Sequence, residues 1–133
     1  MAPANVEIVR RFVRLANDRD LDAMAALCDR DAVLYAPDGW PEPGPWRGLE
    51  AFMGQIAHLQ ADSAEHALSI DEIAAHEDWV LAKHVWYVRG KRSGIETQFH
   101  SSGAYRLHAG KIIEVRYYRE HADALKAVGL ASS

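Results

Sequence analysis

Three side chains of this sequence have the chemistry to move or hold a proton inside a folded core: Asp38, His84 and Tyr117. A carboxylate or imidazole in a water-poor cavity has its pKa pushed toward neutrality, where general acid/base transfer contributes typically about 10²–10⁴-fold to rate. We therefore expect Asp38 or His84 to move a proton, and Tyr117 or Arg119 to stabilise an oxyanion.

Each of these residues also has a purely structural interpretation. His84 fits a core histidine that is hydrogen-bonded by a neighbouring hydroxyl such as that of Tyr117. Asp38 precedes a glycine, and an Asp-Gly pair stabilises a turn. Tyr117 fits a pocket wall, and Arg119 fits an ion pair with Glu120 or with a helix carboxylate. Both interpretations stay open at the level of sequence.

Other catalytic chemistries lack their residue patterns. The single cysteine, Cys28, excludes a disulfide within the chain, and its place in the helical pattern "LDAMAALC" predicts a small buried thiol. No two of the seven histidines have His-x-His or His-x3-His spacing, and neither a glycine-rich phosphate loop nor a nucleophile elbow is present. We expect no metal and no cofactor, with five histidines on helix surfaces or turns: His58, His66, His76, His108 and His121.

The composition predicts a globular protein with a real core. At 133 residues the chain has the length of one compact domain, which we expect to span residues 1–133. A net charge of −4 argues against a nucleic-acid surface, and the basic segment 89–94 predicts a hairpin turn. No apolar run approaches membrane-spanning length and no signal peptide is evident, so we expect no membrane association and a cytoplasmic location.

Hydrophobic periodicity separates a helical front from a strand-rich back. The front predicts a helix capped by Asn5, a short helix from Asp20 to Cys28, a strand at 31–37, a third helix opened by Gly48, and a polar connection at 57–66. The back predicts strands at 68–75, 79–90, 95–107 and 111–120, then a helix at 121–128 capped by Glu120 and ended by Gly129. This order predicts an α+β fold with helices on one face of a curved sheet.

Alternation along the strands indicates which side chains point inward. In the segment 79–90 the more apolar face contains His84 and Trp86. In the segment 95–107 the polar even positions leave the odd positions to form the buried face: Ile95, Phe99, Ser101, Gly103, Tyr105 and Leu107. In the segment 111–119 the same argument predicts four inward residues: Ile113, Val115, Tyr117 and Arg119.

A proline-rich loop, residues 35–48, contains four of the five prolines and two of the four tryptophans. A tryptophan ring left in water forfeits on the order of 1.5–3 kcal/mol of burial free energy. We therefore expect Trp40 and Trp46 either to fill a core or to cover a cavity. The prolines stiffen the loop and would hold the rings in place at low entropic cost.

The segments 5–52 and 110–130 carry a specific series of motifs: "NVEIVRR", "RDLDA", "DAV", "PEPG", "RG" and "ALKAVGL". In these motifs and their spacing the chain resembles the SnoaL-like branch of the nuclear transport factor 2-like superfamily. The resemblance implies a curved, mostly antiparallel sheet that forms a cone-like barrel, with helices that cover the concave face and enclose a pocket. It also implies a homodimer through the outer sheet face.

The known catalytic sets of this superfamily are not retained. The ketosteroid isomerase base, tyrosine and protonated aspartate correspond to Ala36, Phe12 and Gly103. The network of limonene epoxide hydrolase corresponds to Tyr117, His84 and Trp86, and the acid/base aspartate of the polyketide cyclases again corresponds to Tyr117. The resemblance therefore predicts the place of the site more firmly than its reaction.

We expect a cofactor-independent enzyme that acts on a small, largely apolar substrate by general acid/base chemistry, of isomerase, cyclase, dehydratase or epoxide hydrolase type. The alternative is a non-catalytic protein that binds a small hydrophobic molecule. Beside the catalytic candidates Asp38, His84 and Tyr117, the substrate-binding residues expected are Phe12, Tyr35, Trp40, Trp46, Phe52, Trp86, Phe99, Ser101, Val115 and Arg119.

Overall fold

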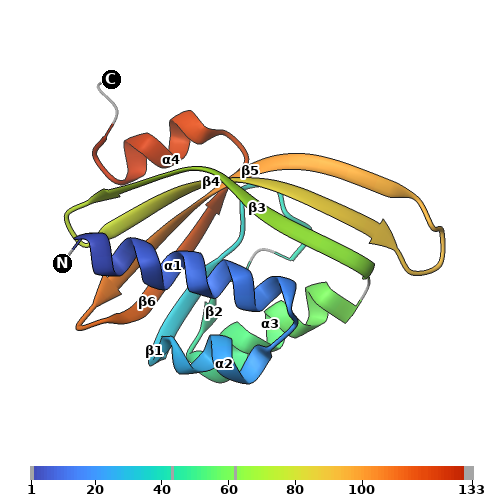
Figure 1. The fold of residues 1–133 in the computed structure, drawn as a ribbon, viewed down its shortest axis with the longest axis horizontal. Coiled ribbons are helices and arrows are strands. Elements are labelled where there is room, and N and C mark those ends of the chain that lie inside the picture. Colours follow the sequence, from blue (N-terminus) through green and yellow to red (C-terminus); the bar gives the residue numbers. More distant parts are fainter. Residues whose placement is uncertain (1, 43, 62, 131–133) are drawn as a thin grey trace.

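The computed structural model describes residues 2–42, 44–61 and 63–130. Pro43 of the proline-rich loop and Asp62 of the expected connection lie outside this part. Figure 1 shows the elements, which in chain order are α1 (Ala2–Asn17), α2 (Leu21–Ala26), β1 (Cys28–Tyr35), β2 (Trp46–Arg47), α3 (Leu49–Ala61), β3 (Ser63–His76), β4 (Trp79–Gly90), β5 (Glu96–His108), β6 (Lys111–Tyr118) and α4 (His121–Ala127).

The described strands form one mixed sheet in the order β2-β1-β6-β5-β4-β3. Strands β3 to β6 are an antiparallel meander, β1 runs parallel to β6, and β2 pairs antiparallel with β1. The predicted α+β fold with a curved, mostly antiparallel sheet is thus confirmed. The sheet is not closed into a full barrel.

Helices lie on both faces of this sheet (Figure 1). The inner face, toward which Val80, Ala82 and Tyr105 point, packs with residues of α1, α2 and α3 in the main core. The outer face packs against α4, where Leu81 and Ala104 meet Ala124 and Val128 in a second cluster. This second layer explains why Ser102, which alternation assigns to the polar face, is buried together with Ala104.

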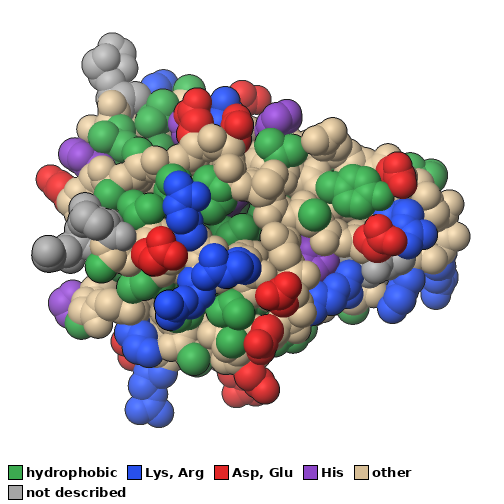
Figure 2. Space-filling model, in the orientation of Figure 1, with side chains coloured by type: hydrophobic (Ala, Val, Ile, Leu, Met, Phe, Trp, Pro, Cys, Tyr) green, Lys and Arg blue, Asp and Glu red, His purple; other side chains and the backbone are tan. Residues whose placement is uncertain are grey.

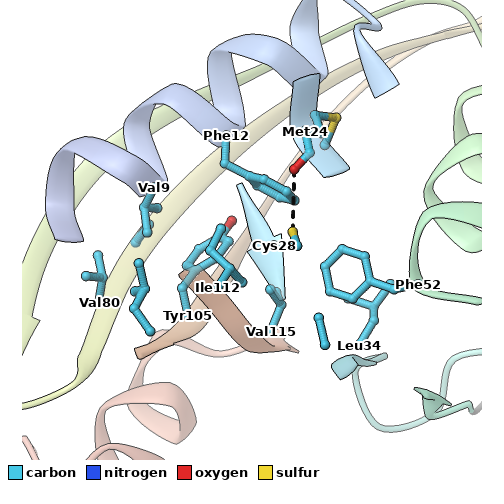
Figure 3. Close-up of a cluster of buried hydrophobic side chains, with 13 residues drawn as sticks. Val9, Phe12, Met24, Cys28, Leu34, Phe52, Val80, Tyr105, Ile112 and Val115 are labelled. Atoms are coloured by element: carbon cyan, nitrogen blue, oxygen red, sulfur yellow. Dashed lines mark hydrogen bonds between the residues drawn. The ribbon is translucent and has the colours of Figure 1, made fainter. Parts of the chain in front are cut away.

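The main core gathers side chains from α1, α2, α3 and the strands β1, β4, β5 and β6 (Figure 3). Phe12 of α1 makes edge-to-face contacts with Phe52 at 6.3 Å and with Tyr105 at 6.1 Å between ring centroids. Cys28 is buried there as predicted, and burial raises the pKa of its thiol to about 12. The thiol is therefore a protonated, apolar part of the core.

Several predicted boundaries are wrong by a few residues. Helix α1 begins at Ala2, before the expected cap at Asn5. Cys28 is the first residue of β1 rather than the last of a helix, because α2 ends at Ala26. Helix α3 continues to Ala61 and β3 already begins at Ser63, so the expected polar connection at 57–66 is divided between these two elements.

Two predicted inward residues, Ile113 and Ile95, are placed differently in the structure. The register between β5 and β6 shifts at Arg106/Leu107, and this irregularity places Ile112, not Ile113, in the core. Ile95 precedes β5 in the β4–β5 hairpin, which extends beyond the helices (Figure 1), and it is 65% exposed. Alternation thus predicts the wrong inward residues where a bulge shifts which side chains face the core, and where no second layer covers the strand.

On the face shown in Figure 2, acidic and basic side chains are interspersed rather than gathered by sign. The net charge of −4 fits such a mixed surface. No helix in the described residues is both long and apolar enough to cross a membrane.

Candidate functional site

A cavity of about 380 Å³ lies between the inner face of the sheet, the helices α1, α2 and α3, and the proline-rich loop. Its volume falls in the usual range of small-molecule sites, about 300–1,000 Å³. None of the described lining residues is Asp, Glu, Lys or Arg. The lining residues are Phe12, Val13, Ala16, Met24, Leu34, Ala36, Pro37, Trp40, Trp46, Gln55, Ile56, Leu59, Gln60, His66, Leu68, Trp86, Val88, Thr97, Phe99, Ser101, Tyr105 and Tyr117.

The proline-rich loop contributes Pro37, Trp40 and Trp46 to this wall. Trp46 is held because β2 pairs with β1, with Trp46 opposite Leu34. A turn holds Trp40, whose N–H donates to the Pro37 carbonyl at 3.1 Å. Both rings are half-buried and line the cavity, so of the two roles expected for them the loop performs the covering one.

His84 lies at the centre of a hydrogen-bonded network on the inner face. It has no solvent exposure, and its Nε2 is 3.0 Å from the hydroxyl of Tyr105. Its Nδ1 is 3.5 Å from Ser101 Oγ, which also accepts a 2.5 Å hydrogen bond from the indole N–H of Trp86. The expectation that a hydroxyl satisfies the ring is thus met, but the hydroxyl belongs to Tyr105 rather than to Tyr117.

Burial keeps this network uncharged. It lowers the pKa of His84 to about 4, so the imidazole is neutral at neutral pH. It raises the pKa of Tyr117 to about 12, although a hydrogen bond from Tyr105 opposes the shift, and it raises the pKa of Tyr105 well above its usual range. The phenol of Tyr117 is therefore a neutral hydrogen-bonding group in the cavity wall.

The two tautomers of a neutral His84 give the network two donor directions. If Ser101 donates to Nδ1, then Nε2–H donates to Tyr105. The Tyr105 O–H is then free to donate to Tyr117, and the Tyr117 O–H is left for the cavity. In the other tautomer the order reverses, and the Ser101 O–H is left instead. Both ends of the network line the cavity, so either tautomer offers a hydrogen-bond donor there.

Gly103 makes room for this arrangement. A Cβ at this position would lie 2.7 Å from Cε1 of His84 and 2.8 Å from Cε1 of Tyr105. Gly103 pairs with Ala82 on β4 and with Tyr117 on β6, so both flanking strands fix its backbone. The two rings can meet edge to face at 6.0 Å only because this side chain is missing.

Seven of the thirteen predicted site residues line the cavity: Phe12, Trp40, Trp46, Trp86, Phe99, Ser101 and Tyr117. Phe52 and Val115 are instead fully buried in the core beneath it. His84 does not line the cavity itself; it lies behind the wall, hydrogen-bonded to Tyr105 and Ser101 and in ring contact with Trp86 and Tyr117. Tyr35 turns to the guanidinium of Arg116, which lies 3.9 Å from its ring centroid.

Asp38 and Arg119 lie outside the cavity wall. Both are exposed, and Arg119 follows the end of β6 at Tyr118 rather than continuing the strand. The side chain of Arg119 approaches the proline-rich loop at Gly39, where a Cβ would be 3.7 Å from its Nη2. Asp38 and Arg119 therefore lie on the outside of the proline-rich loop and not in the cavity.

Five polar lining residues were not among the predicted site residues: Gln55, Gln60, His66, Thr97 and Tyr105. Gln55 lies three residues after Phe52 and four before Leu59, so helical spacing places it on the apolar face of α3. His66 lies two residues before Leu68, so alternation would have revealed it had the strand been extended to Ser63. The prediction that His66 lies on a helix surface or turn is wrong.

In chemical terms the site is an apolar cavity with a few neutral hydrogen-bonding groups in its wall. It can bind a small apolar molecule and donate a hydrogen bond to an oxygen atom of that molecule. In the part of the chain that the structure describes, no group of three or more His, Cys, Asp or Glu side chains is placed to hold a metal ion.

Comparisons with known proteins agree with this fold. A family model described as SnoaL-like domain matches residues 9–115. A structure described as an NTF2-like protein of unknown function from Burkholderia pseudomallei is similar at 20% identity over 94% of this chain and 97% of that chain, with a TM-score of 0.79. No curated protein sequence matches the chain.

Two further solved structures are similar over most of their length. One is a Mycobacterium tuberculosis LEH-like epoxide hydrolase, at 20% identity over 96% of this chain and 90% of that chain, with a TM-score of 0.75. The other is a provisionally named SnoaL-like polyketide cyclase from Jannaschia sp., at 16% identity over 98% and 95%, with a TM-score of 0.79. At such identities the likeness shows the fold alone.

Gly103→Ala is expected to lower the free energy of unfolding by about 1–3 kcal/mol, because the added methyl overpacks the site between His84 and Tyr105. Urea denaturation followed by circular dichroism measures this change. Gly54→Ala is the matched control, since Gly54 lies in α3 with open space around it and alanine favours the helix by about 0.5–1 kcal/mol. Equal stability of the two variants would contradict the role of Gly103.

The buried neutral His84 is expected to make the fold acid-sensitive. Its pKa is about 4 in the folded chain and about 6.5 in the unfolded chain, so between these values the unfolded state binds the extra proton. Stability from this residue is full above pH 6.5 and falls by about 3 kcal/mol as the pH falls to 4. Denaturation at pH 7 and pH 4 measures the loss of unfolding free energy on acidification, which should be smaller by this amount in His84→Gln than in the wild type. An equal loss in both proteins would refute the role of His84.

Proposed function

This chain belongs to the SnoaL-like domain family, and from that premise we propose that it binds a small, largely apolar molecule in the cavity. The observation that carries the proposal is the wall itself, because aromatic and aliphatic side chains from three helices, the sheet and the proline-rich loop surround about 380 Å³. Displacing water from such a wall is favourable at roughly 25 cal/mol per Å² of apolar surface.

The aromatic side chains of the wall favour a flat or ring-shaped ligand. Trp86 and Phe99 stack with their planes 6° apart and their centroids separated by 5.8 Å, and Tyr117 meets Trp86 edge to face at 6.3 Å. These rings are already held by one another and by the hydrogen bond from Trp86 to Ser101. A ligand that packs on them therefore orders few additional side chains, which reduces the entropic cost of binding.

The second candidate is an enzyme of isomerase, cyclase, dehydratase or epoxide hydrolase type. The observation that favours it is the network from His84 through Tyr105 to Tyr117, which would aim a neutral phenol at an oxygen atom of the substrate. Such a donor stabilises negative charge that develops on a carbonyl or epoxide oxygen. His84 would then act through the tyrosines rather than on the substrate, and Asp38 would have no direct part. The homodimer and the cytoplasmic location remain predictions.

Naphthalene is expected to bind the wild-type protein. Trp40→Ala is expected to lower the affinity for naphthalene by roughly 10–100-fold, because about 1.5–3 kcal/mol of buried contact is lost. Isothermal titration calorimetry measures both affinities. Trp79→Ala is the matched control, because Trp79 lies against Arg106 and the outer cluster and should leave the affinity unchanged. Failure of naphthalene to bind, or an equal effect of both substitutions, would overturn the proposal.

Turnover separates the enzyme from the binding protein. If hydrophobic ketones, epoxides or polycyclic polyketides are converted by the wild type, Tyr117→Phe should reduce the rate about 10²-fold or more, because it removes the hydrogen-bond donor while keeping the ring. The same variant should still bind naphthalene. Conversion that survives both Tyr117→Phe and His84→Gln would remove the network from the mechanism.

A further inference from the structure

Two buried polar atoms in the described cavity wall have no hydrogen-bond partner: Nε2 of Gln55 and Nδ1 of His66. Both residues line the cavity, and Gln55 is only 5% exposed. A buried polar group without a partner is costly and rare in folded proteins. Two such groups in the wall of one cavity therefore indicate that something inside the cavity pairs with them.

The contact of His66 defines what its free atom can do. Its Nε2 lies 2.8 Å from the carbonyl oxygen of Ala16 at the end of α1. A carbonyl only accepts hydrogen bonds, so Nε2 carries a proton. When the ring is neutral, Nδ1 therefore carries a lone pair and can only accept a hydrogen bond. This bond also fixes the ring against α1. His66 thus has a positioned hydrogen-bond acceptor that is buried and unpaired, on a residue that lines the cavity.

Gln55 presents the opposite chemistry. Its unpaired Nε2 carries two N–H donors, and it projects from the face of α3 that also carries the buried Phe52. The neighbouring Gln60 provides a contrast, because its Nε2 donates to the same Ala16 carbonyl at 3.3 Å. Gln60 lines the cavity with a bonded amide, whereas the amide nitrogen of Gln55 is buried without a partner.

We propose that Gln55 and His66 form a hydrogen-bonding subsite for a hydroxyl group of the ligand, so that the cavity selects hydroxylated ring compounds over plain hydrocarbons. A hydroxyl group accepts from the Gln55 N–H and donates to the His66 Nδ1, which matches both free atoms. A hydrocarbon would leave both unpaired in a site from which it has excluded water. The inference rests on the proposed function, that the cavity holds a small, largely apolar molecule.

The subsite is distant from the Tyr117 network. Tyr117 lies on β6 and His66 on β3, three strand spacings apart in the order β6-β5-β4-β3, or about 14 Å along a flat sheet. The pairs Gly103–Tyr117 and His66–Val88 also place them at different levels along the strands. The subsite therefore recognises an end of the ligand that does not touch Tyr117.

The test compares 2-naphthol with naphthalene by isothermal titration calorimetry at pH 8. The wild type is expected to bind 2-naphthol roughly tenfold or more tightly. Gln55→Met removes the donor at nearly equal size. His66→Met removes the Nδ1 acceptor, and the Ala16 carbonyl keeps its hydrogen bond from Gln60. Each should reduce the preference for 2-naphthol over naphthalene several-fold. Gln98→Met is the matched control, because Gln98 is exposed and does not line the cavity, and it should retain the preference.

The ¹⁵N chemical shift of His66 reports hydrogen bonding at Nδ1 directly, and a change in packing alone would not alter it in the same way. In protein labelled with ¹⁵N histidine, the Nδ1 resonance of His66 should shift when 2-naphthol binds and stay in place when naphthalene binds. Equal affinity of the wild type for both probes, with no shift, would overturn the subsite and leave the proposed function intact. Failure of both probes to bind would overturn both.

Discussion

The arrangement of side chains on the inner face of the sheet depends on the burial of one imidazole, that of His84. His84 has no solvent exposure, and its two nitrogens find the hydroxyls of Tyr105 and Ser101. A buried ring of this kind is tolerated only when it is neutral and hydrogen-bonded, since both an ionised and an unpaired imidazole would be costly there. Gly103 follows from the same requirement, because any larger side chain at this position would occupy the space of the two rings.

The cavity begins where this paired network ends. Tyr117 and Ser101 terminate the network and line the cavity, while Trp86 joins the two regions through its hydrogen bond to Ser101 and its stack on Phe99. The same contacts that satisfy His84 therefore hold the aromatic wall. Stability and binding are coupled here, because a change that loosens the imidazole also loosens the surface on which a ligand would pack.

Much of this arrangement was predictable from the sequence, and the failures have physical causes. Alternation placed His84 and Trp86 on the inner face, and the cost of exposing tryptophan predicted that Trp40 and Trp46 would either fill a core or cover a cavity. The cavity positions of Asp38 and Arg119 were inferred by continuing a strand past its end, where a turn takes over. The role of Tyr105 depends on a contact between β4 and β5 that periodicity within one strand does not describe.

The polar groups of the wall fall into two classes that differ in what they require. Tyr105, Ser101 and Trp86 are paired within the protein, so the fold alone explains them. Gln55 and His66 each have a free atom that no contact among the described residues satisfies, although a nearby amide, Gln60, is satisfied. A fold that needed only stability would gain by apolar residues of the same shape at these two positions. The unpaired atoms are thus better explained by the proposed hydroxylated ligand than by the packing of the wall.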